Sequence, residues 1–376
     1  MDDPTGQSAA KPTRAIAWAD PDQVPLLRLL AERCGLVWSG AGSPQRGRSL
    51  EVARALSEGQ PQDASAFDDV RSALAGLGEA ARPEPGTLML LAAPVPSDVN
   101  PAEQRVRPAL SVRVATLEPI PASLIGTGGD LSAMGVFRLA PMFRHARAVR
   151  ESVEVRGAFG PIRTMAVSAM GQAGTGSLGA RLLDAVDLIT LMMGEPETVD
   201  ASYAGPGVAP HPEAGAAVAP VRMLPGEDLR GLSGDMTVHL RFADGRSALA
   251  HVSDSAGAWR RVATVVGSAG RIDLDDESWA WSNPAGKVID ELKPRPASAR
   301  GIKDRRARSR GPSALDTLSE AISRMLDPGL HDPPPARPAS ALACAVAAVL
   351  SARTGQPEFP ATLRRIAGAD DDTPDE

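Results

Sequence analysis

Side chains that commonly catalyse reactions or bind metals are few and widely spaced in this sequence of 376 residues. The five histidines (His145, His211, His239, His251 and His331) lack the spacing of a metal site, and Cys34 and Cys344 form no CxxC motif. Neither a P-loop nor a Ser/His/Asp nucleophile arrangement is found. We therefore expect no metal site, with His239 and His251 as polar residues on two arms of a hairpin.

One segment has the features of a functional helix. A glycine-rich entry, Gly174 to Gly179, leads into an amphipathic helix that ends at Gly194-Glu195-Pro196 before a strand. Asp184 lies within this helix, among apolar residues. Whether the protein is an enzyme depends on which polar groups this helix carries.

Composition limits the function classes. The length fits two domains, and apolar residues at 43% with aromatic residues at 3% predict cores of Ala, Val and Leu. A net charge of -6 argues against nucleic acid as a main partner. No signal peptide is recognisable, and no apolar run approaches the roughly 18 residues of a membrane span. We expect a reduced cytoplasmic protein, and the abundant Ala, Gly, Pro and Arg suggest a GC-rich bacterial genome.

Strand and helix patterns alternate through the first ~120 residues, with short connections. Strands are predicted at 14–19, 36–38, 87–93 and 112–117, and helices at 24–34, 49–56, 67–74 and 102–110. This alternation is typical of a doubly wound parallel sheet, as in Rossmann-like domains.

The second half changes character. Strands are predicted at 162–168, 236–242, 247–253 and 263–266, with a hairpin turn at Asp244-Gly245, and late helices at 314–326 and 339–352. This pattern predicts an α+β domain with a largely antiparallel, open-faced sheet. The expected organisation is a disordered leader (1–12), a Rossmann-like domain (13–125), the α+β domain (126–365) and a disordered acidic tail (366–376). The α+β domain includes a basic loop (293–313), and its last helices can pack back on the first domain.

The order of several short motifs resembles the Gfo/Idh/MocA family, which includes glucose-fructose oxidoreductase and inositol dehydrogenase. The motifs are Ala92-Ala93-Pro94, Thr116 to Ile120, Arg138 with Pro141, Gly157 to Ile162, the helix 174–194, Arg241 to Gly245, Val266 to Asp273, and Ser351 to Pro357. The resemblance implies NAD(P)-dependent sugar or polyol oxidation. It also implies a homo-oligomer formed through the exposed face of the second sheet, which the apolar strands 236–242 and 263–266 would fit.

The family's dinucleotide-binding positions are substituted. Where the family has Gly-x-Gly-x-x-Gly, this chain has Ala19-Asp20-Pro21-Asp22-Gln23-Val24, which has no glycine, two acids that repel phosphate and a proline without an N–H. Asp20 is instead expected to cap a helix that begins at Pro21.

The positions that would bind the rest of the cofactor also differ from the family. The stretch from Ser39 to Pro44 lacks the acid that holds the adenosine ribose; Arg46 and Arg48 could meet a 2′-phosphate but are expected in a solvated turn. Pro94 takes a further position that the resemblance assigns to cofactor binding.

The catalytic positions implied by the resemblance are substituted as well. The family's Lys is replaced by Glu118 or deleted, and its helical Asp and His correspond to Ala180 and Asp184. Arg138 and Arg181 fall beside the implied substrate cleft. Glu118 and Asp184 could act as acid and base, or they could be remnant polar residues of a cleft without redox function.

Three functional readings follow from these substitutions. The leading hypothesis is a protein that has lost hydride transfer, binds no dinucleotide, and keeps a cleft for a small sugar-like molecule or serves as a subunit of an assembly. The alternative is an active NAD(P)-dependent sugar or polyol oxidoreductase with an atypical phosphate loop. A third is lyase or hydrolytic chemistry by Glu118 and Asp184. The basic run Lys293 to Arg310 is expected to be a solvated loop.

Overall fold

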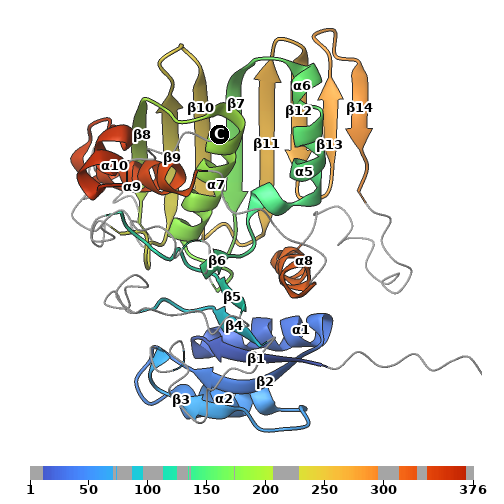
Figure 1. Ribbon diagram of the computed structural model, residues 1–376, viewed down its shortest axis with the longest axis vertical. Helices are drawn as coiled ribbons and strands as arrows, with labels where there is room; N and C mark the ends of the chain where they lie inside the picture. Colours follow the sequence, from blue (N-terminus) through green and yellow to red (C-terminus); the bar gives the residue numbers. More distant parts are fainter. Residues whose placement is uncertain are drawn as a thin grey trace, which may run out of the picture.

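The computed structural model describes residues 12–70, 73, 87–95, 113–124, 134, 137–172, 174–205, 228–294, 313–327 and 337–369. The predicted helix at 102–110 and most of the predicted leader, acidic tail and basic loop lie outside these residues. The helix predicted at 67–74 starts too early, because Phe67 is the last residue of a strand. The disordered tail predicted from 366 also starts too early, because the last helix continues to Ala367 and Ala369 is buried. In the described part, two β-sheets lie one above the other along the long axis of the molecule (Figure 1).

The first sheet is fully parallel, with strand order β3-β2-β1-β4-β5-β6. Its strands are β1 (Thr13–Trp18), β2 (Leu36–Gly42), β3 (Ser65–Phe67), β4 (Leu88–Leu91), β5 (Arg113–Thr116) and β6 (Phe137–Leu139). Helices α1 (Val24–Cys34), α2 (Ser49–Ser57) and α8 (Ala314–Leu326) share one hydrophobic core with it. The order reverses between β1 and β4, which is the point where doubly wound folds bind their ligands, outside the carboxyl ends of the strands.

The second sheet is mostly antiparallel, with order β14-β13-β12-β11-β7-β10-β9-β8, and only β7 and β10 are parallel neighbours. Its strands are β7 (Ile162–Met170), β8 (Thr198–Ala204), β9 (Asp235–Arg241), β10 (Ser247–Ser253), β11 (Arg260–Gly267), β12 (Gly270–Asp275), β13 (Trp279–Ser282) and β14 (Val288–Leu292). The expected fold class, a Rossmann-like parallel sheet plus an α+β domain with a largely antiparallel sheet, is confirmed.

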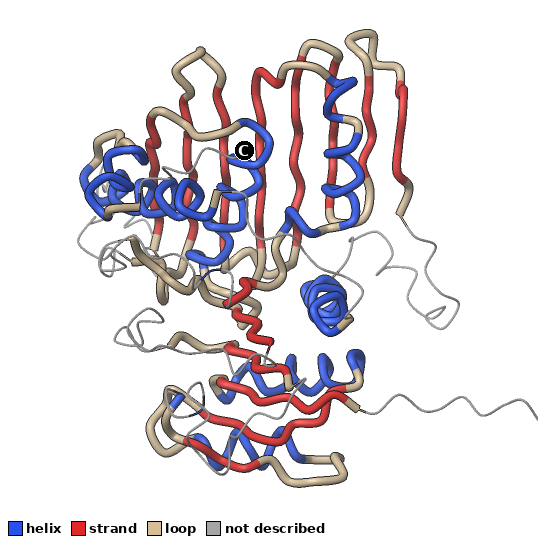
Figure 2. Tube along the Cα trace, in the orientation of Figure 1, coloured by secondary structure: helices blue, strands red, loops and turns tan. Residues whose placement is uncertain are grey.

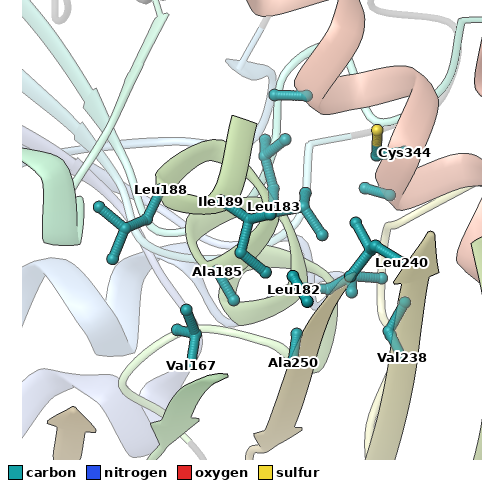
Figure 3. Packing of buried hydrophobic residues seen from close by; sticks show 14 of the residues in the cluster. Val167, Leu182, Leu183, Ala185, Leu188, Ile189, Val238, Leu240, Ala250 and Cys344 are labelled. Carbon is teal, nitrogen blue, oxygen red and sulfur yellow. The ribbon is translucent and has the colours of Figure 1, made fainter. Parts of the chain in front are cut away.

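Helices cover one face of the second sheet (Figures 1 and 2). They are α5 (Arg147–Glu154), α6 (Arg156–Phe159), α7 (Leu178–Met193), α9 (Pro338–Thr354) and α10 (Pro360–Ala367). Figure 3 shows Leu182 and Ala185 of α7 packed against Val167 and Ala250 of the sheet, with Cys344 of α9 nearby. Alternate residues of the central strands, such as β9 and β11, point into this core, as the period of two requires.

Local sequence explains where α7 begins and ends. The hydroxyl of Ser177 accepts a hydrogen bond from the backbone N–H of Ala180 at 3.2 Å, and Gly194 ends the helix with φ of 86°. Gly179 is needed because a Cβ there would lie 2.0 Å from the carbonyl oxygen of Leu229. The glycine-rich entry therefore brings the start of α7 close to the backbone of a distant loop.

The first sheet tests several predictions from the sequence. Helix α1 has the predicted bounds, and Asp20 is the extended N-cap residue of a short 3-10 turn, η1 (Pro21–Gln23), which continues into α1. Ser39 was wrongly placed at the end of the second strand, because β2 continues to Gly42 and Ser39 lies in its middle. The first sheet also includes β6, which lies beyond the domain boundary expected at 125.

The strands of the second sheet bear on the predicted oligomer interface. The hairpin β9–β10 turns at Asp244 and Gly245 as predicted. However, most apolar residues of the predicted strands 236–242 and 263–266, such as Val238 and Val265, point into the core, and only Val266 lies on the other face. The core-facing residues therefore give no support to an oligomer interface on that face. No helix in the described ranges is long and apolar enough to cross a membrane.

Candidate functional site

Every charged side chain that is buried among the described residues belongs to one cluster between the two sheets. It contains five acids and three arginines: Glu118, Asp184, Asp187, Asp254 and Asp276, with Arg144, Arg181 and Arg261. Glu118 follows β5 at the carboxyl edge of the first sheet, and the others come from the second half of the chain. Buried ionisable groups are costly and concentrate at functional sites. This buried charge cluster is therefore the candidate site.

Asp184 is held in an ion pair inside the cluster. One of its oxygens accepts the backbone N–H of Phe143 at 2.5 Å, and the other accepts Nη1 of Arg261 at 3.0 Å. Arg261 also pairs with Asp276. Burial raises the pKa of Asp184, and the guanidinium of Arg261 lowers it. Because both oxygens are occupied, Asp184 stabilises the packing of α7 and is not a free base.

Glu118 meets the start of α7, where the resemblance placed the implied chemistry. Its carboxyl oxygen Oε2 accepts a hydrogen bond from the Ser177 hydroxyl at 2.5 Å, and only 6% of the residue is exposed. Burial raises the pKa of Glu118 to about 7, with Asp254 raising it further and Arg181 lowering it. Glu118 can therefore hold or release a proton near neutral pH. In the described part of the chain it makes no contact with Asp184.

The two arginines that the resemblance placed beside a substrate have different surroundings. Arg181 is buried, donates to the hydroxyl of Thr175 at 2.7 Å, and lies over the ring of Trp259 at 5.0 Å. Its guanidinium takes the space that a side chain at Gly171 would need. Burial lowers its pKa to about 10. Arg138, on β6, is exposed, and the structure does not bring it into contact with the cluster.

The residues at the reversal point between β1 and β4 do not form a pyrophosphate cradle. The side chain of Gln23 accepts the N–H of Asp20 at 2.9 Å and donates to the carbonyl of Ala92 at 2.9 Å. The N–H of Ala19 donates to the carbonyl of Gly42, and Pro21 has no N–H to offer. The backbone N–H groups of Ala19, Asp20 and Gln23 are thus already used, Pro21 has none, and Gln23 ties this loop to the end of β4.

An aromatic pair fills the carboxyl edge at the end of β2, the part of the sheet where a dinucleotide's ribose is held. The rings of Trp18 and Phe67 stack with centroids 5.9 Å apart, and Phe67 lies so close to Gly42 that a Cβ there would clash at 2.4 Å. The indole N–H of Trp18 donates to the carbonyl of Pro94 at 3.2 Å. Ser39 donates its hydroxyl to the carbonyl of Ala15. These residues do not fit a ribose.

Sequence reasoning missed most members of the buried charge cluster. Arg261 carried the clearest signal, because it falls at a core-facing position of an alternating strand, two residues before Ala263. An arginine at such a position needs a buried partner. Arg144 pairs with Asp187 at 2.8 Å, one turn of α7 beyond Asp184, so the helical spacing of the two aspartates was a second signal.

Sequence comparison finds no relatives. No family model matches the chain, and no curated protein is significantly similar to it. Solved structures are similar in fold. GenD2 from gentamicin A biosynthesis, in complex with NAD, is 17% identical with a TM-score of 0.57, over 96% of this chain and 99% of that one.

Two further structures agree. An oxidoreductase from Sinorhizobium meliloti is 15% identical with a TM-score of 0.59, over 92% of this chain and 98% of that one. Levoglucosan dehydrogenase with NADH and levoglucosan is 15% identical with a TM-score of 0.56, over 93% and 99%. The chain has the Gfo/Idh/MocA fold. The expected resemblance is thus confirmed at the level of the fold.

Proposed function

We propose that this protein is a non-redox relative of the Gfo/Idh/MocA oxidoreductases, which binds a small sugar-like molecule at the buried charge cluster and does not bind NAD(P). The observation that carries the proposal is the Gln23 side chain, which bonds to both Asp20 and Ala92 across the strand ends where a pyrophosphate would approach. A dinucleotide would have to break these bonds and face Asp20 and Asp22. No lysine or arginine in the stretch from Ala19 to Val24 offsets that repulsion.

The position of Glu118 supports the same proposal. In the family resemblance a lysine stands at or near this position, and here a buried carboxyl group stands there instead, bonded to Ser177. The helix dipole at the start of α7 also favours a carboxyl group at this place over a lysine. Hydride transfer needs a bound nicotinamide, and nothing in Glu118 supplies that chemistry.

The proposal extends to assembly through the exposed face of the second sheet. That face carries the small or apolar side chains Ala166, Leu249, Val262 and Val266 near its centre, with charged residues such as Arg271 further out. An apolar centre with a polar rim is typical of protein interfaces. Leu249→Arg is expected to convert a dimer or larger oligomer to monomer in analytical ultracentrifugation, and a wild-type monomer would sink this part of the proposal.

The dinucleotide part is tested by titrating the purified chain with NADH and NADPH. The readouts are nicotinamide fluorescence and thermal shift, with NAD and NADP in the second assay. No saturable binding in the submillimolar range is expected. Saturable binding in that range would overturn the proposal, whatever the substrate turns out to be.

The alternative function is an active NAD(P)-dependent sugar or polyol oxidoreductase. The observation that favours it is that structures of the same fold were solved with NAD or NADH. It requires Gln23 and Phe67 to move away from the strand ends. The double variant Gln23→Gly, Phe67→Ala separates the two functions, because an oxidoreductase that needs these movements should bind NADH more tightly once both side chains are removed, whereas a chain without a phosphate cradle should not.

A further inference from the structure

A cavity lies on the face of the second sheet that the helices leave uncovered. Its volume is about 460 Å³, and the described residues that line it belong to strands β11 to β14 and to the chain just after β12 and β14. Val262 and Thr264 line it, and they alternate with the core-facing residues of β11, so they lie on the uncovered face. The cavity is therefore separate from the buried charge cluster, which Arg261 of the same strand reaches from the other face.

The lining of this cavity suits an apolar side chain better than a polar ligand. Most of its polar side chains are already bonded to one another. The three pairs are Thr264 with Asp273 at 2.8 Å, Ser278 with Asp275 at 2.9 Å, and Lys293 with Glu291 at 2.9 Å. Val262 and Ala280 lie between these pairs in the sheet. A polar ligand would have to compete with hydrogen bonds that exist, whereas an apolar side chain gains from leaving water.

The same face carries an exposed large apolar side chain. Leu249 of β10 is 41% exposed and lies opposite Ala166 of β7, which in turn lies opposite Thr264 of β11. Figure 1 shows these three strands side by side near the middle of the sheet. Leu249 is thus two strands from the wall of the cavity, roughly 10 Å away at the usual strand spacing. It lies beside the cavity and is not part of its lining.

A second copy related by a twofold axis along β7 brings the exposed leucine and the cavity together. Such an axis exchanges β10 with β11 and β9 with β12, because these strands lie at equal distances on either side of β7. Leu249 of one copy then lies over Thr264 and the cavity of the other, and the reverse contact forms at the same time. Ala166 lies on the axis, where its small side chain lets the two sheets approach each other closely.

The polar residues of the same row support this axis. His239 lies opposite Leu249, and Asp273 is equally far from β7 on the cavity side, so the axis places His239 of one copy over Asp273 of the other. An axis across the strands through this row would instead place Asp273 against Asp273 and Leu249 against Leu249, with the cavity unfilled. Arg241 and Arg271 meet in the next row, but both are exposed, so that solvent and salt screen their repulsion.

We propose that two copies of this chain pair through the uncovered face of the second sheet, with Leu249 of each copy inserted into the β11–β14 cavity of the other. This inference rests on the assembly part of the proposed function and names the contact that holds the two copies. In an interface with twofold symmetry each contact is made twice, so a single substitution changes the dimer at two places. The partner subunit therefore completes a cavity that one copy leaves open.

The test measures the dimer Kd of the full chain by analytical ultracentrifugation. Leu249→Arg and Thr264→Glu are each expected to raise it about tenfold or more, because each places a charge in an apolar contact. An equimolar mixture of the two variants should form a heterodimer at least about tenfold tighter than either variant alone. The introduced arginine meets the introduced glutamate at one contact, and the other contact keeps its native residues. Leu29→Arg, which changes a leucine that is 48% exposed on α1, is the matched control and should assemble like wild type.

The outcomes separate this inference from the function on which it rests. A monomeric wild type overturns the assembly part of the proposed function and this inference with it. A wild-type dimer that Leu249→Arg dissociates and Thr264→Glu leaves intact overturns the inserted contact alone, and assembly through the sheet stands. A mixture no tighter than the single variants also overturns it.

A second variant tests the cavity without adding a charge. Ala280→Phe fills the cavity from its floor and should weaken the dimer by about tenfold, since Leu249 of the partner subunit then has no space to enter. A dimer as tight as wild type overturns the inference even where Thr264→Glu fails to fold. Thermal denaturation of each variant checks that lost assembly does not come from a lost fold.

Discussion

The carboxyl edge of the first sheet and the buried charge cluster differ in how their polar groups are paired. At the edge, Gln23 is bonded to Asp20 and Ala92. Trp18 stacks on Phe67 and donates to a carbonyl, so these polar groups are paired without a ligand. In the cluster, Glu118 and Asp254 are buried without forming an ion pair with any described residue, and five acids stand against three arginines. The edge is closed by its own side chains, whereas the acids of the cluster outnumber its arginines.

This difference locates where a ligand can contribute binding energy. A ligand at the edge must first replace hydrogen bonds that already exist, and the gain is then only the difference between two sets of bonds. The cluster instead holds five acids and three arginines, so a cationic group bound there would reduce its net negative charge. Function on this fold is therefore expected to depend on the cluster, while the carboxyl edge of the first sheet is expected to contribute stability.

The largest effect is expected from Arg261→Met. This change leaves Asp184 and Asp276 buried without their partner, and breaking such a pair costs about 3–5 kcal/mol. Urea denaturation measures it. Arg271→Met removes an exposed pair with Asp273 and should cost less than about 1 kcal/mol. If both variants lose the same small amount, the cluster is not the stabilising network inferred from its burial.

The pH dependence of stability is the next largest effect. The pKa of Glu118 is raised by burial from 4.5 to about 7, so the folded protein binds a proton that the unfolded chain releases. Its contribution is fully present below pH 4.5 and is lost as the pH rises to about 7, by about 3 kcal/mol. Glu118→Gln should remove this slope. Denaturation curves of both proteins from pH 4 to 8 compare them, and parallel profiles would contradict the placement of Glu118.

The same two regions show what the sequence can reveal. Residue periodicity predicts α1 and the hairpin at Asp244-Gly245, because these depend on neighbours along the chain. The loss of glycines before α1 is also visible in sequence. By contrast, the bond from Gln23 to Ala92 and the pairing of Asp184 with Arg261 join residues far apart in the chain, and no local pattern encodes them.

A smaller effect is expected from Gln23→Ala. It leaves the N–H of Asp20 and the carbonyl of Ala92 without their partner, at a cost of about 1–2 kcal/mol. Gln62→Ala, at an exposed position, is the control and should change little. Thermal denaturation of the two variants makes the comparison. A Gln23 variant as stable as wild type would mean that this edge is not held closed by its own side chains.

The smallest effect is expected from Arg138→Ala. Arg138 is exposed on β6, so its removal should change the free energy of unfolding by less than about 0.5 kcal/mol. The resemblance nevertheless places it beside a substrate, and calorimetric titration of both proteins with D-glucose separates the two readings. Unchanged affinity assigns ligand binding to the cluster alone. Weaker binding with unchanged stability adds Arg138 to the site, and it extends the binding region from Glu118 to β6.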